Sequence, residues 1–420
     1  MRREDHRASQ GDIALSAREV VWVTLDFYPD DQASSQLFTD LLVRLAEHTK
    51  ITVFCGYPVE ATKGRPGPVP RRETYRGISI VRCGFNVAEK HGLLNRAILY
   101  AAFLAHAAWR LLWIDRRTLV FGVTSPAFIA HVLWLTSRLR RFRYGYMFLD
   151  VYPEALFALG RLKPTSPLAR VWLPFNRLSY RAASLLAVLG RDMIPLLEQH
   201  YSIDPRRVMY IPHWSALELE HPVPVAANPL AKRLGIEDRF IVQYSGNMGL
   251  LHDIDAIVRA AEQLRDDPRI HFLLIGKGRR RQAAERLARD LGLTNITWMD
   301  FVPRECLDET LSCCHAALVS LRAGMEGVAV PSKLYGILAL GRPVIAQVPR
   351  GSEIALVVEE ERCGCLVEPG DTEGLACAIK SLASDAPLVA QMSAAAFSAY
   401  RLKYTLDHAV GAFRDLWASI

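Results

Sequence analysis

Short runs of apolar and β-branched residues alternate with segments of helical period throughout residues 20–212. Strands that alternate with helices along a chain form a parallel sheet covered by helices. The first half of the sequence therefore predicts a doubly wound α/β domain. Its predicted strands are Val20–Asp26, Ile51–Gly56, Ile78–Cys83, Thr118–Val123, Arg143–Asp150, Leu185–Gly190 and Val208–Pro212.

The same alternation resumes after a Pro- and Ala-rich interval, HPVPVAANP at 221–229, which has the composition of a linker. Two Rossmann-like α/β domains facing across a cleft are therefore predicted, with ligands bound beyond the carboxyl ends of the strands. The predicted strands of the second domain are Phe240–Gly246, Ile270–Gly276, Ile296–Phe301, Ala316–Leu321, Pro343–Val348 and Cys363–Pro369. The predicted divisions are a tail at 1–19, a first domain at 20–217, a linker at 218–229, a second domain at 230–388 and terminal helices at 389–420.

Composition fits two packed domains. The chain has 420 residues, of which 50% are hydrophobic and 23% charged. The first nineteen residues lack the apolar run of a secretory signal, so we expect a cytoplasmic protein. The eight cysteines form no CxxC pair, and we expect them to be reduced core thiols.

The charge balance favours an anionic partner. The formal net charge is +7 and the sequence pI is about 9.0. The sequence has neither a zinc-finger spacing nor an aromatic RNA-binding signature, so we expect no nucleic-acid partner. An anionic membrane surface or a phosphorylated substrate is the expected partner.

The longest apolar stretch, LLNRAILYAAFLAHAAWRLLWI at 93–114, has two interpretations. Arg96, His106 and Arg110 interrupt it, so it does not predict a membrane-spanning helix. It is either a core helix or a helix in the plane of the membrane interface, which would make the protein peripheral on the inner face of the plasma membrane. In the second case the following arginines would face lipid: Arg116, Arg117, Arg138, Arg140, Arg141 and Arg143.

Two glycine-containing turns follow predicted strands of the second domain. In YSGNMGLLHD, backbone N–H groups around Gly246 could receive a phosphate, although such a turn is also an ordinary tight connection. In GKGRRR, Lys277 could reach a phosphate or be solvated. Both interpretations stay open for each turn.

The stretch EGVAVPSKLYGILALGRPV at 326–344 carries more information. Pro331 suits the first turn of a helix, and Ser332 and Lys333 then offer a hydroxyl, free N–H groups and a cation, which suits a diphosphate. Gly336 costs about 1 kcal/mol in a helix interior relative to Ala. Either a ligand passes close to it or the helix packs tightly there on a neighbouring strand.

Candidate residues of the first domain follow two predicted strands. Asp150 ends one strand and Glu154 follows shortly after, and strand-end acids facing a cleft suit proton transfer or sugar binding. Glu154 could equally be a charge that the helix dipole favours. The small residues Ala33, Ser34 and Ser35 could cradle a substrate, or Ser34 or Ser35 could only cap a helix.

Taken together, the segments FYPDDQASSQ, DVYPE, VMYIPHW, YSGNMG, LLIGKG, WMDFVPRECL and SKLYGILALGRPV resemble the family-4 retaining glycosyltransferases of GT-B fold, over about residues 20–400. The subgroup that the chain most resembles is the WbuB-like sugar transferases of the colanic-acid and O-antigen type. The resemblance implies that the second domain binds a nucleotide-diphosphate sugar, with a UDP-sugar favoured. It also implies a saccharide acceptor in the first domain and a last helix that crosses back to the first domain. The basic charge and the apolar stretch at 93–114 favour a lipid-linked acceptor, and a soluble acceptor stays open.

The resemblance assigns roles to matching positions. Base contacts would come from the segment from Phe301 and Val302 to Pro303, and phosphate contacts from the Gly246 turn and the start of the Ser332 helix. Glu326 matches the first acid of the family's Glu-x7-Glu element, beside the transferred sugar, and Asp150 would lie near the reacting centre. The remaining expected site residues are Asn247, His252, Lys277, Lys333 and Leu334 for the donor, Glu154 for catalysis, and Ala33, Ser34 and Ser35 for the acceptor loop.

Three positions depart from the family pattern. The second acid, which holds the nucleotide ribose, falls at Leu334 or Gly336, depending on the alignment. The usual Arg and Lys after the first strand of the second domain are Asn247 and His252, and the usual Gly-Gly of the first domain is Ala33, Ser34 and Ser35. We therefore hypothesise that Lys333 takes over the diphosphate charge and that Gly336 lets the ribose approach.

No DxD element for metal binding is evident, and the pair Asp30 and Asp31 is interpreted as a turn, so metal-independent transfer without a cofactor is expected. Two other functions stay open. A nucleotide-sugar 2-epimerase of the same fold would need no acceptor. A non-catalytic scaffold or binding partner could have lost the ribose acid.

Overall fold

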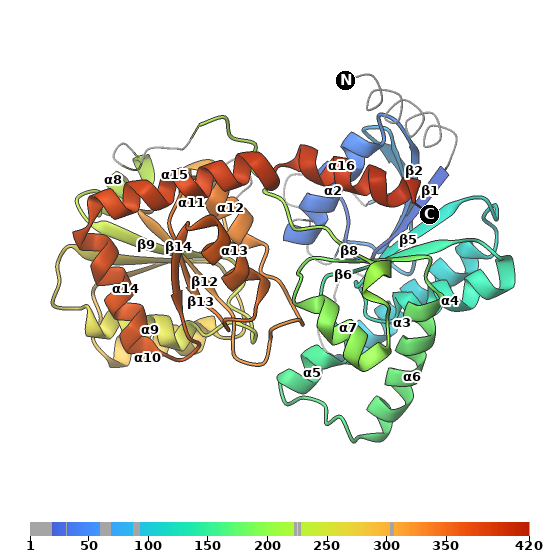
Figure 1. The fold of residues 1–420 in the computed structure, drawn as a ribbon, viewed down its shortest axis with the longest axis horizontal. Helices are drawn as coiled ribbons and strands as arrows, with labels where there is room; N and C mark the ends of the chain where they lie inside the picture. Colours follow the sequence, from blue (N-terminus) through green and yellow to red (C-terminus); the bar gives the residue numbers. More distant parts are fainter. Residues whose placement is uncertain are drawn as a thin grey trace. The chain divides into compact units, whose positions relative to one another are not determined.

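The computed structural model describes residues 19–30, 32–58, 69–86, 93–221, 225, 228–302 and 306–419. The chain divides into two compact units (Figure 1). Unit 1 combines Met1–Pro212 with Leu406–Ile420, and unit 2 is His213–Thr405. Apart from Glu19, the predicted tail lies outside the described residues, as do Asp31 of the acidic pair and Pro303 of the predicted base-binding segment.

Unit 1 is built on an eight-stranded sheet in the order β3-β4-β2-β1-β5-β6-β7-β8. Neighbouring strands run parallel, except that β3 pairs antiparallel with β4. The strands are β1 (Glu19–Val23), β2 (Lys50–Cys55), β3 (Arg72–Tyr75), β4 (Ile78–Arg82), β5 (Leu119–Val123), β6 (Tyr144–Phe148), β7 (Leu185–Val188) and β8 (Val208–Tyr210). The helices are α2 (Ala33–Leu45), α3 (Leu93–Leu111), α4 (Ile129–Arg140), α5 (Glu154–Ala158), α6 (Pro167–Ala182), α7 (Met193–Tyr201), the 3₁₀ turn Pro205–Arg207 and α16 (Leu406–Ala418).

Successive residues of β5 show which helices cover each face of this sheet. The Phe121 ring stacks on Trp22 of β1, 5.0 Å between centroids, and also packs against Phe413 of α16. A Cβ atom at the next residue, Gly122, would lie 2.6 Å from a methyl carbon of Leu133 on α4. Because side chains alternate across a strand, α16 and α4 cover opposite faces, and Gly122 is required for the close approach of α4.

The last helix of the chain belongs to unit 1. In Figure 1, α16, in red, lies beside α2, in blue. Trp417 and Phe413 pack against the buried Trp22, and Arg44 of α2 pairs with Asp407 at 2.5 Å. Burial of these aromatic rings anchors α16 to the sheet.

Unit 2 contains a six-stranded parallel sheet in the order β11-β10-β9-β12-β13-β14. The strands are β9 (Phe240–Ser245), β10 (Ile270–Ile275), β11 (Ile296–Met299), β12 (Ala316–Ser320), β13 (Val344–Gln347) and β14 (Gly364–Val367). The helices are α8 (Pro229–Leu234), α9 (Ile254–Gln263), α10 (Arg281–Asp290), α11 (Leu307–Leu311), α12 (Lys333–Ala339), α13 (Glu353–Glu361), α14 (Thr372–Ser384) and α15 (Ala386–Lys403).

Helix α15 stays with unit 2. It packs against α12 and α14, and the Tyr335 ring of α12 meets Tyr404 at 5.0 Å. The Ser215 N–H donates to the Tyr404 carbonyl at 3.0 Å, so the segment after Pro212 also joins unit 2. The units therefore part at Pro212 and Thr405, whereas the sequence divisions lie at 217 and 388.

Each strand predicted from the sequence is present, although most end earlier than predicted and β1 and β2 begin one residue earlier. The antiparallel edge strand β3 was not predicted. The expectation of core thiols is wrong for two cysteines, because Cys306 and Cys377 are exposed. Within the described parts of the chain, no helix is both long enough and apolar enough to cross a membrane.

Candidate functional site

The strand order of each sheet marks where a ligand would bind. In unit 1 the chain leaves β1 toward β2 and later returns on the other side of β1 as β5. In unit 2 it leaves β9 toward β10 and returns as β12. Ligands of doubly wound sheets bind at such switch points, beyond the carboxyl ends of the strands. The candidate residues are therefore those that follow β1, β5 and β6 in unit 1, and β9 and β12 in unit 2.

Lys333 lies at the switch point of unit 2. Its Nζ atom is 3.6 Å from the centre of the Tyr244 ring, and a Cβ atom at Gly246 would lie 3.1 Å from it. The Nζ atom is buried and has no hydrogen-bond partner among the described residues. Burial lowers the pKa of Lys333 to about 7. A buried ammonium group that lacks a counter-charge suits an anionic ligand.

His252 joins the two strands of the switch point. Its Nδ1 donates to the Ser320 carbonyl at 2.6 Å, and Ser320 Oγ accepts the Asp253 N–H at 2.9 Å. Burial, with a smaller contribution from the Lys333 charge, lowers the pKa of His252 to about 3. His252 is therefore a neutral imidazole at pH 7, whereas the Lys333 amine is about half protonated at that pH.

The turns after β9 and β10 pack backbone against backbone. Gly276 has φ +134°, and a Cβ atom there would lie 2.0 Å from the Gly246 carbonyl oxygen. The Met248 N–H donates to the Lys277 carbonyl at 2.8 Å. A side chain at Gly276 would separate the turns, so this glycine holds the predicted phosphate-binding turn in place.

The other predicted donor residues lie around these turns. Asn247 is exposed, and its side-chain oxygen would lie 2.7 Å from a Cβ atom at Gly278. Phe301 is half exposed and lies over Gly276, with the partly buried Val302 after it. The Lys277 side chain is largely exposed and is 4.0 Å from Asp300, which agrees with the solvated interpretation.

The residues that follow β12 differ in how far they are exposed. Glu326 is exposed and has no charged partner among the described residues, whereas Leu334 is fully buried. Of Leu334, predicted as a donor-binding residue, only the backbone could therefore meet a ligand. Ser332 makes no side-chain cap. A Cβ atom at Gly336 would meet no atom within 4 Å, so the interpretation of Gly336 as tight helix packing is wrong.

In unit 1, polar residues gather after β1, β5 and β6. Ser125 Oγ donates to Asp26 at 2.6 Å, which links the loops of β1 and β5. Burial raises the pKa of Asp150, after β6, to about 6. Burial and the charge of Asp150 raise the pKa of Tyr152, and burial and the charge of Asp26 raise the pKa of Tyr100 on α3. Two carboxyl groups and two phenols thus share the switch point.

Glu154 lies in the interior, not at the surface. It is 4% exposed and accepts a hydrogen bond from the Tyr201 hydroxyl at 2.7 Å. Asn176 donates to Tyr201 at 3.1 Å and to the Tyr152 carbonyl at 2.6 Å. The prediction of Glu154 as a catalytic acid facing a cleft is therefore replaced by a positioning role, because this network holds the loop that carries Asp150 and Tyr152.

The predicted acceptor loop is the first turn of α2. Ala33 is exposed, Ser34 is half-buried and Ser35 is fully buried. Gln32 is the N-cap residue, so the prediction that Ser34 or Ser35 caps this helix is wrong. The preceding loop is held by the buried Arg82, which donates to the Tyr28 carbonyl at 2.9 Å.

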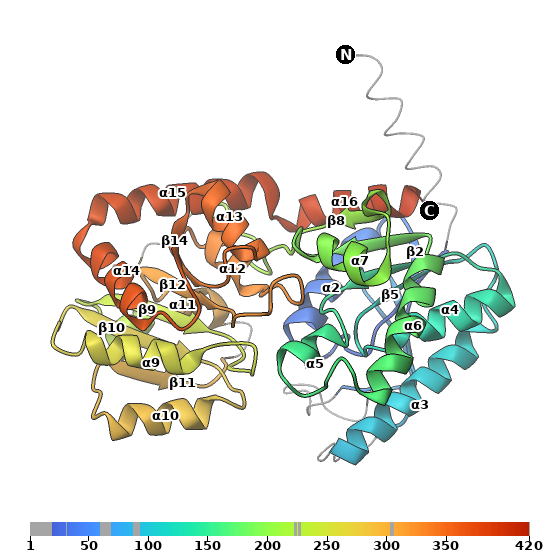
Figure 2. The ribbon, with the colours of Figure 1, turned by 60° about the horizontal axis from the view of Figure 1, so that its bottom comes forward.

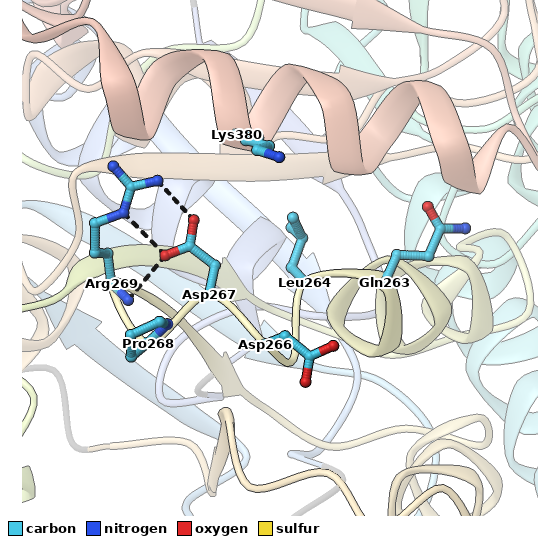
Figure 3. Close-up of a pocket in the computed structure, with 7 residues that line it drawn as sticks. All are labelled: Gln263, Leu264, Asp266, Asp267, Pro268, Arg269 and Lys380. Carbon is cyan, nitrogen blue, oxygen red and sulfur yellow. Dashed lines mark hydrogen bonds and ion pairs between the residues drawn. The ribbon is translucent and has the colours of Figure 1, made fainter.

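A depression on unit 2 is not the site. Figure 3 shows its lining, in which Asp267 and Arg269 pair at 2.7 Å. These residues precede β10 and so lie at the amino end of the strands, away from the switch point. Elsewhere, the residues that the structure describes contain no cluster of three His, Cys, Asp or Glu side chains suited to a metal.

Known proteins match both the sequence and the fold. Residues 239–385 match the family model described as glycosyl transferases group 1. This part of unit 2 is therefore similar to the group 1 glycosyltransferases. A protein of Pseudomonas aeruginosa named a probable glycosyltransferase, WbjE, is 29% identical over 70% of this chain and 73% of its own. WcaI of Escherichia coli K12, named for colanic acid biosynthesis, is 24% identical over 72% of this chain and 75% of its own.

The whole fold is GT-B. HepE of Anabaena, solved with UDP and glucose, superposes with a TM-score of 0.73 over 96% of this chain and all of its own, at 15% identity. The residues that match the group 1 family model include the Gly246 turn, the Lys333 helix and Glu326.

Three contacts at the two switch points were missed from the sequence. They are Lys333 with Tyr244, His252 with Ser320 and Asp26 with Ser125. The last two contacts could have been expected from the position of their serines in the sequence. Ser320 ends β12 and Ser125 follows β5, and both strands lie beside a switch point. The aromatic ring beneath Lys333 has no such signal, since the two residues are far apart in the chain.

Proposed function

We propose that the protein is a retaining glycosyltransferase that moves a sugar from a nucleotide-diphosphate sugar to a saccharide acceptor in cell-surface polysaccharide synthesis. The observation that carries the donor half is the buried Nζ of Lys333, which lacks a partner beside the Gly246 turn. UDP-sugar is the favoured donor, which is consistent with UDP in the solved HepE. WcaI, which is named for colanic acid biosynthesis, supports the expected biological setting.

The donor would lie in unit 2. Lys333 and the backbone N–H groups of the Gly246 turn would neutralise the diphosphate, and the exposed Phe301 would meet the base. Glu326 would position the transferred sugar with its free carboxylate. Gly336, beside open space, would let the ribose approach the helix.

In the proposed sugar transfer, the protein mainly has to stabilise the negative charge that develops on the leaving diphosphate. The acceptor oxygen forms a bond to the anomeric carbon as the bond from that carbon to the diphosphate oxygen breaks. The electron pair of the broken bond leaves with the nucleoside diphosphate, and the hydroxyl proton passes to the departing phosphate oxygen on the same face of the sugar. Lys333 lowers the barrier by stabilising the developing negative charge.

Unit 1 would supply the acceptor site. Asp150 would orient the acceptor hydroxyl, or take its proton in place of the phosphate oxygen. Asp26, Tyr100 and Tyr152 would surround the acceptor sugar with hydrogen-bonding groups. We propose that this acceptor sits on a lipid carrier, at the inner face of the plasma membrane.

A thermal-shift screen tests the donor first. A ligand that binds only the folded protein raises its melting temperature by mass action. We expect UDP and UDP-sugars to raise it, and GDP and ADP to act less. No shift with any nucleotide would favour the scaffold function. Conversion of a UDP-sugar without acceptor would favour the epimerase, and an inverted product anomer would contradict retention.

A further inference from the structure

Most of the exposed hydrophobic side chains of unit 1 gather on three neighbouring helices. Helices α3, α4 and α6 lie side by side (Figure 2). The Phe128 and Trp172 rings stack at 4.5 Å, and Phe175 meets Trp134 at 6.2 Å, so α4 and α6 run along each other. The exposed large hydrophobic residues of this α3–α4–α6 face are Trp109, Trp113, Leu135, Leu139, Leu168, Val171, Phe175 and Leu178.

Helix α6 shows that this exposure follows a pattern. Its exposed apolar residues recur at Leu168, Val171, Phe175 and Leu178, the spacing of one helical stripe. Its opposite side is buried through Trp172 and other residues. The helix therefore has two apolar sides, and packing within unit 1 uses only one of them. An exposed stripe of this kind marks an interaction surface.

The charge of the same region favours an anionic partner. Between Leu93 and Ala183 the sequence contains thirteen Lys and Arg residues but three Asp and Glu residues. Of these acids, Glu154 is buried and Asp150 lies at the switch point. Exposed arginines flank the apolar stripe, among them Arg138, Arg140 and Arg170.

We propose that the α3–α4–α6 face docks on an anionic phospholipid membrane. Apolar side chains would enter the interface between headgroups and acyl chains, and the arginines would contact lipid phosphates. The exposed pair Trp109 and Trp113, 5.5 Å between rings, suits the headgroup level. A second copy of the chain fits this face less well, because two such faces would bring like charges together.

The role that we infer for this surface rests on the proposed function, in which unit 1 binds a lipid-linked acceptor. Tyr100, near Asp26, and Trp109 lie on the same helix. Nine residues of helix span about 14 Å. An acceptor sugar at the switch point of unit 1 could therefore remain attached to a lipid held beneath the same helix.

Flotation of the full chain with vesicles tests the docking. We expect it to float with phosphatidylcholine vesicles that contain phosphatidylglycerol, to float little with phosphatidylcholine alone, and to be released at about 0.5 M salt. The triple variant Val171→Ser, Phe175→Ser, Leu178→Ser should lose most of this binding. Its matched control is Leu402→Ser, an equally exposed leucine on α15 of unit 2.

A charge variant provides a second, independent measurement. Arg138→Gln, Arg140→Gln and Arg170→Gln together should weaken binding to the anionic vesicles severalfold, whereas Arg286→Gln with Arg289→Gln on α10 should not. Wild-type protein that stays with neither vesicle, or a triple variant that floats like wild type, would overturn the proposal. So would a dimer in light scattering that the triple variant converts to monomer. The shift in melting temperature caused by UDP should be the same in wild type and in every variant. Loss of membrane binding with this shift intact would therefore leave the proposed donor binding unaffected.

Discussion

The Nζ atom of Lys333 lies 3.6 Å from the centre of the Tyr244 ring, buried and with no hydrogen-bond partner among the described residues. The electron-rich face of the ring offsets part of the cost of burying the ammonium group. Burial lowers the pKa of Lys333 to about 7. A diphosphate beside Lys333 would favour its protonated form and supply the counter-charge that it lacks.

Replacement of Lys333 by Met should weaken UDP binding by about tenfold to a hundredfold, the range for a charged hydrogen bond. Titration calorimetry at pH 7 measures the change, with the exposed Lys232→Met as the control. Equal affinity of the Lys333→Met variant and wild type would remove Lys333 from the donor site.

The same variant should be more stable without ligand, in a way that depends on pH. The pKa of Lys333 is about 7 in the folded protein against an ordinary value of 10.5, so between these pH values the unfolded chain binds more protons. The free energy of unfolding of wild type therefore rises with pH in this window. The advantage of Lys333→Met should be full below pH 7 and vanish near pH 10.5. Denaturant titrations across this range would show a constant difference if Lys333 were not buried.

Asp150 and the Glu154 network should respond oppositely to substitution. The pKa of Asp150 is about 6 when folded against 3.8, so its ionisation costs stability, fully so above pH 6. Asp150→Asn should therefore raise the melting temperature at pH 7 and lower kcat at least about a hundredfold. Wild-type activity should fall as the pH drops below 6. A stable, fully active Asp150→Asn variant would exclude a role in the reaction.

The contrasting variant is Tyr201→Phe. It leaves the buried Glu154 carboxylate without its hydroxyl donor, which should cost about 1–3 kcal/mol of unfolding free energy. Because neither residue would touch the acceptor, kcat at temperatures well below melting should change little. A large loss of kcat with unchanged stability would return Glu154 to the catalytic residues.

The sequence predicted the fold well because both domains repeat strong local patterns. Most of the strands are short apolar runs, and this signal is visible in the sequence without knowledge of distant contacts. The strand β3 was missed because its sequence, RETY, is short and partly exposed at a sheet edge. Its place is fixed by pairing with β4 and by the buried Arg82, which binds Glu73.

The site was predictable in outline only. Motifs located the Gly246 turn and Lys333, since glycines after strands and a lysine before an apolar helix are visible in one sequence. Glu154 is buried and Asp150 is half-buried, although both acids follow the same strand. Such a distinction depends on Tyr201 and Asn176, which are distant in sequence.

Transfer should not require a divalent metal. The proposed charge stabilisation uses Lys333 and backbone N–H groups, so EDTA should leave the rate of sugar transfer unchanged. The assay should follow UDP release with an acceptor present and include added Mg²⁺ as the comparison. Loss of activity in EDTA that Mg²⁺ restores would contradict metal independence.

The open space beside Gly336 allows a gain-of-function test. A Cβ atom there meets nothing within 4 Å, and any ordinary residue is favoured over Gly in a helix interior by up to about 1 kcal/mol. Both Gly336→Ala and Gly336→Glu should therefore raise the melting temperature of the free protein. If the ribose lies beside Gly336, only Gly336→Glu adds a carboxylate that can accept its hydroxyls, and UDP should bind about fivefold more tightly, since one such hydrogen bond contributes about 1 kcal/mol. Equal UDP affinity in Gly336→Ala, Gly336→Glu and wild type would place the ribose elsewhere, because neither added bulk nor added charge would then have reached it.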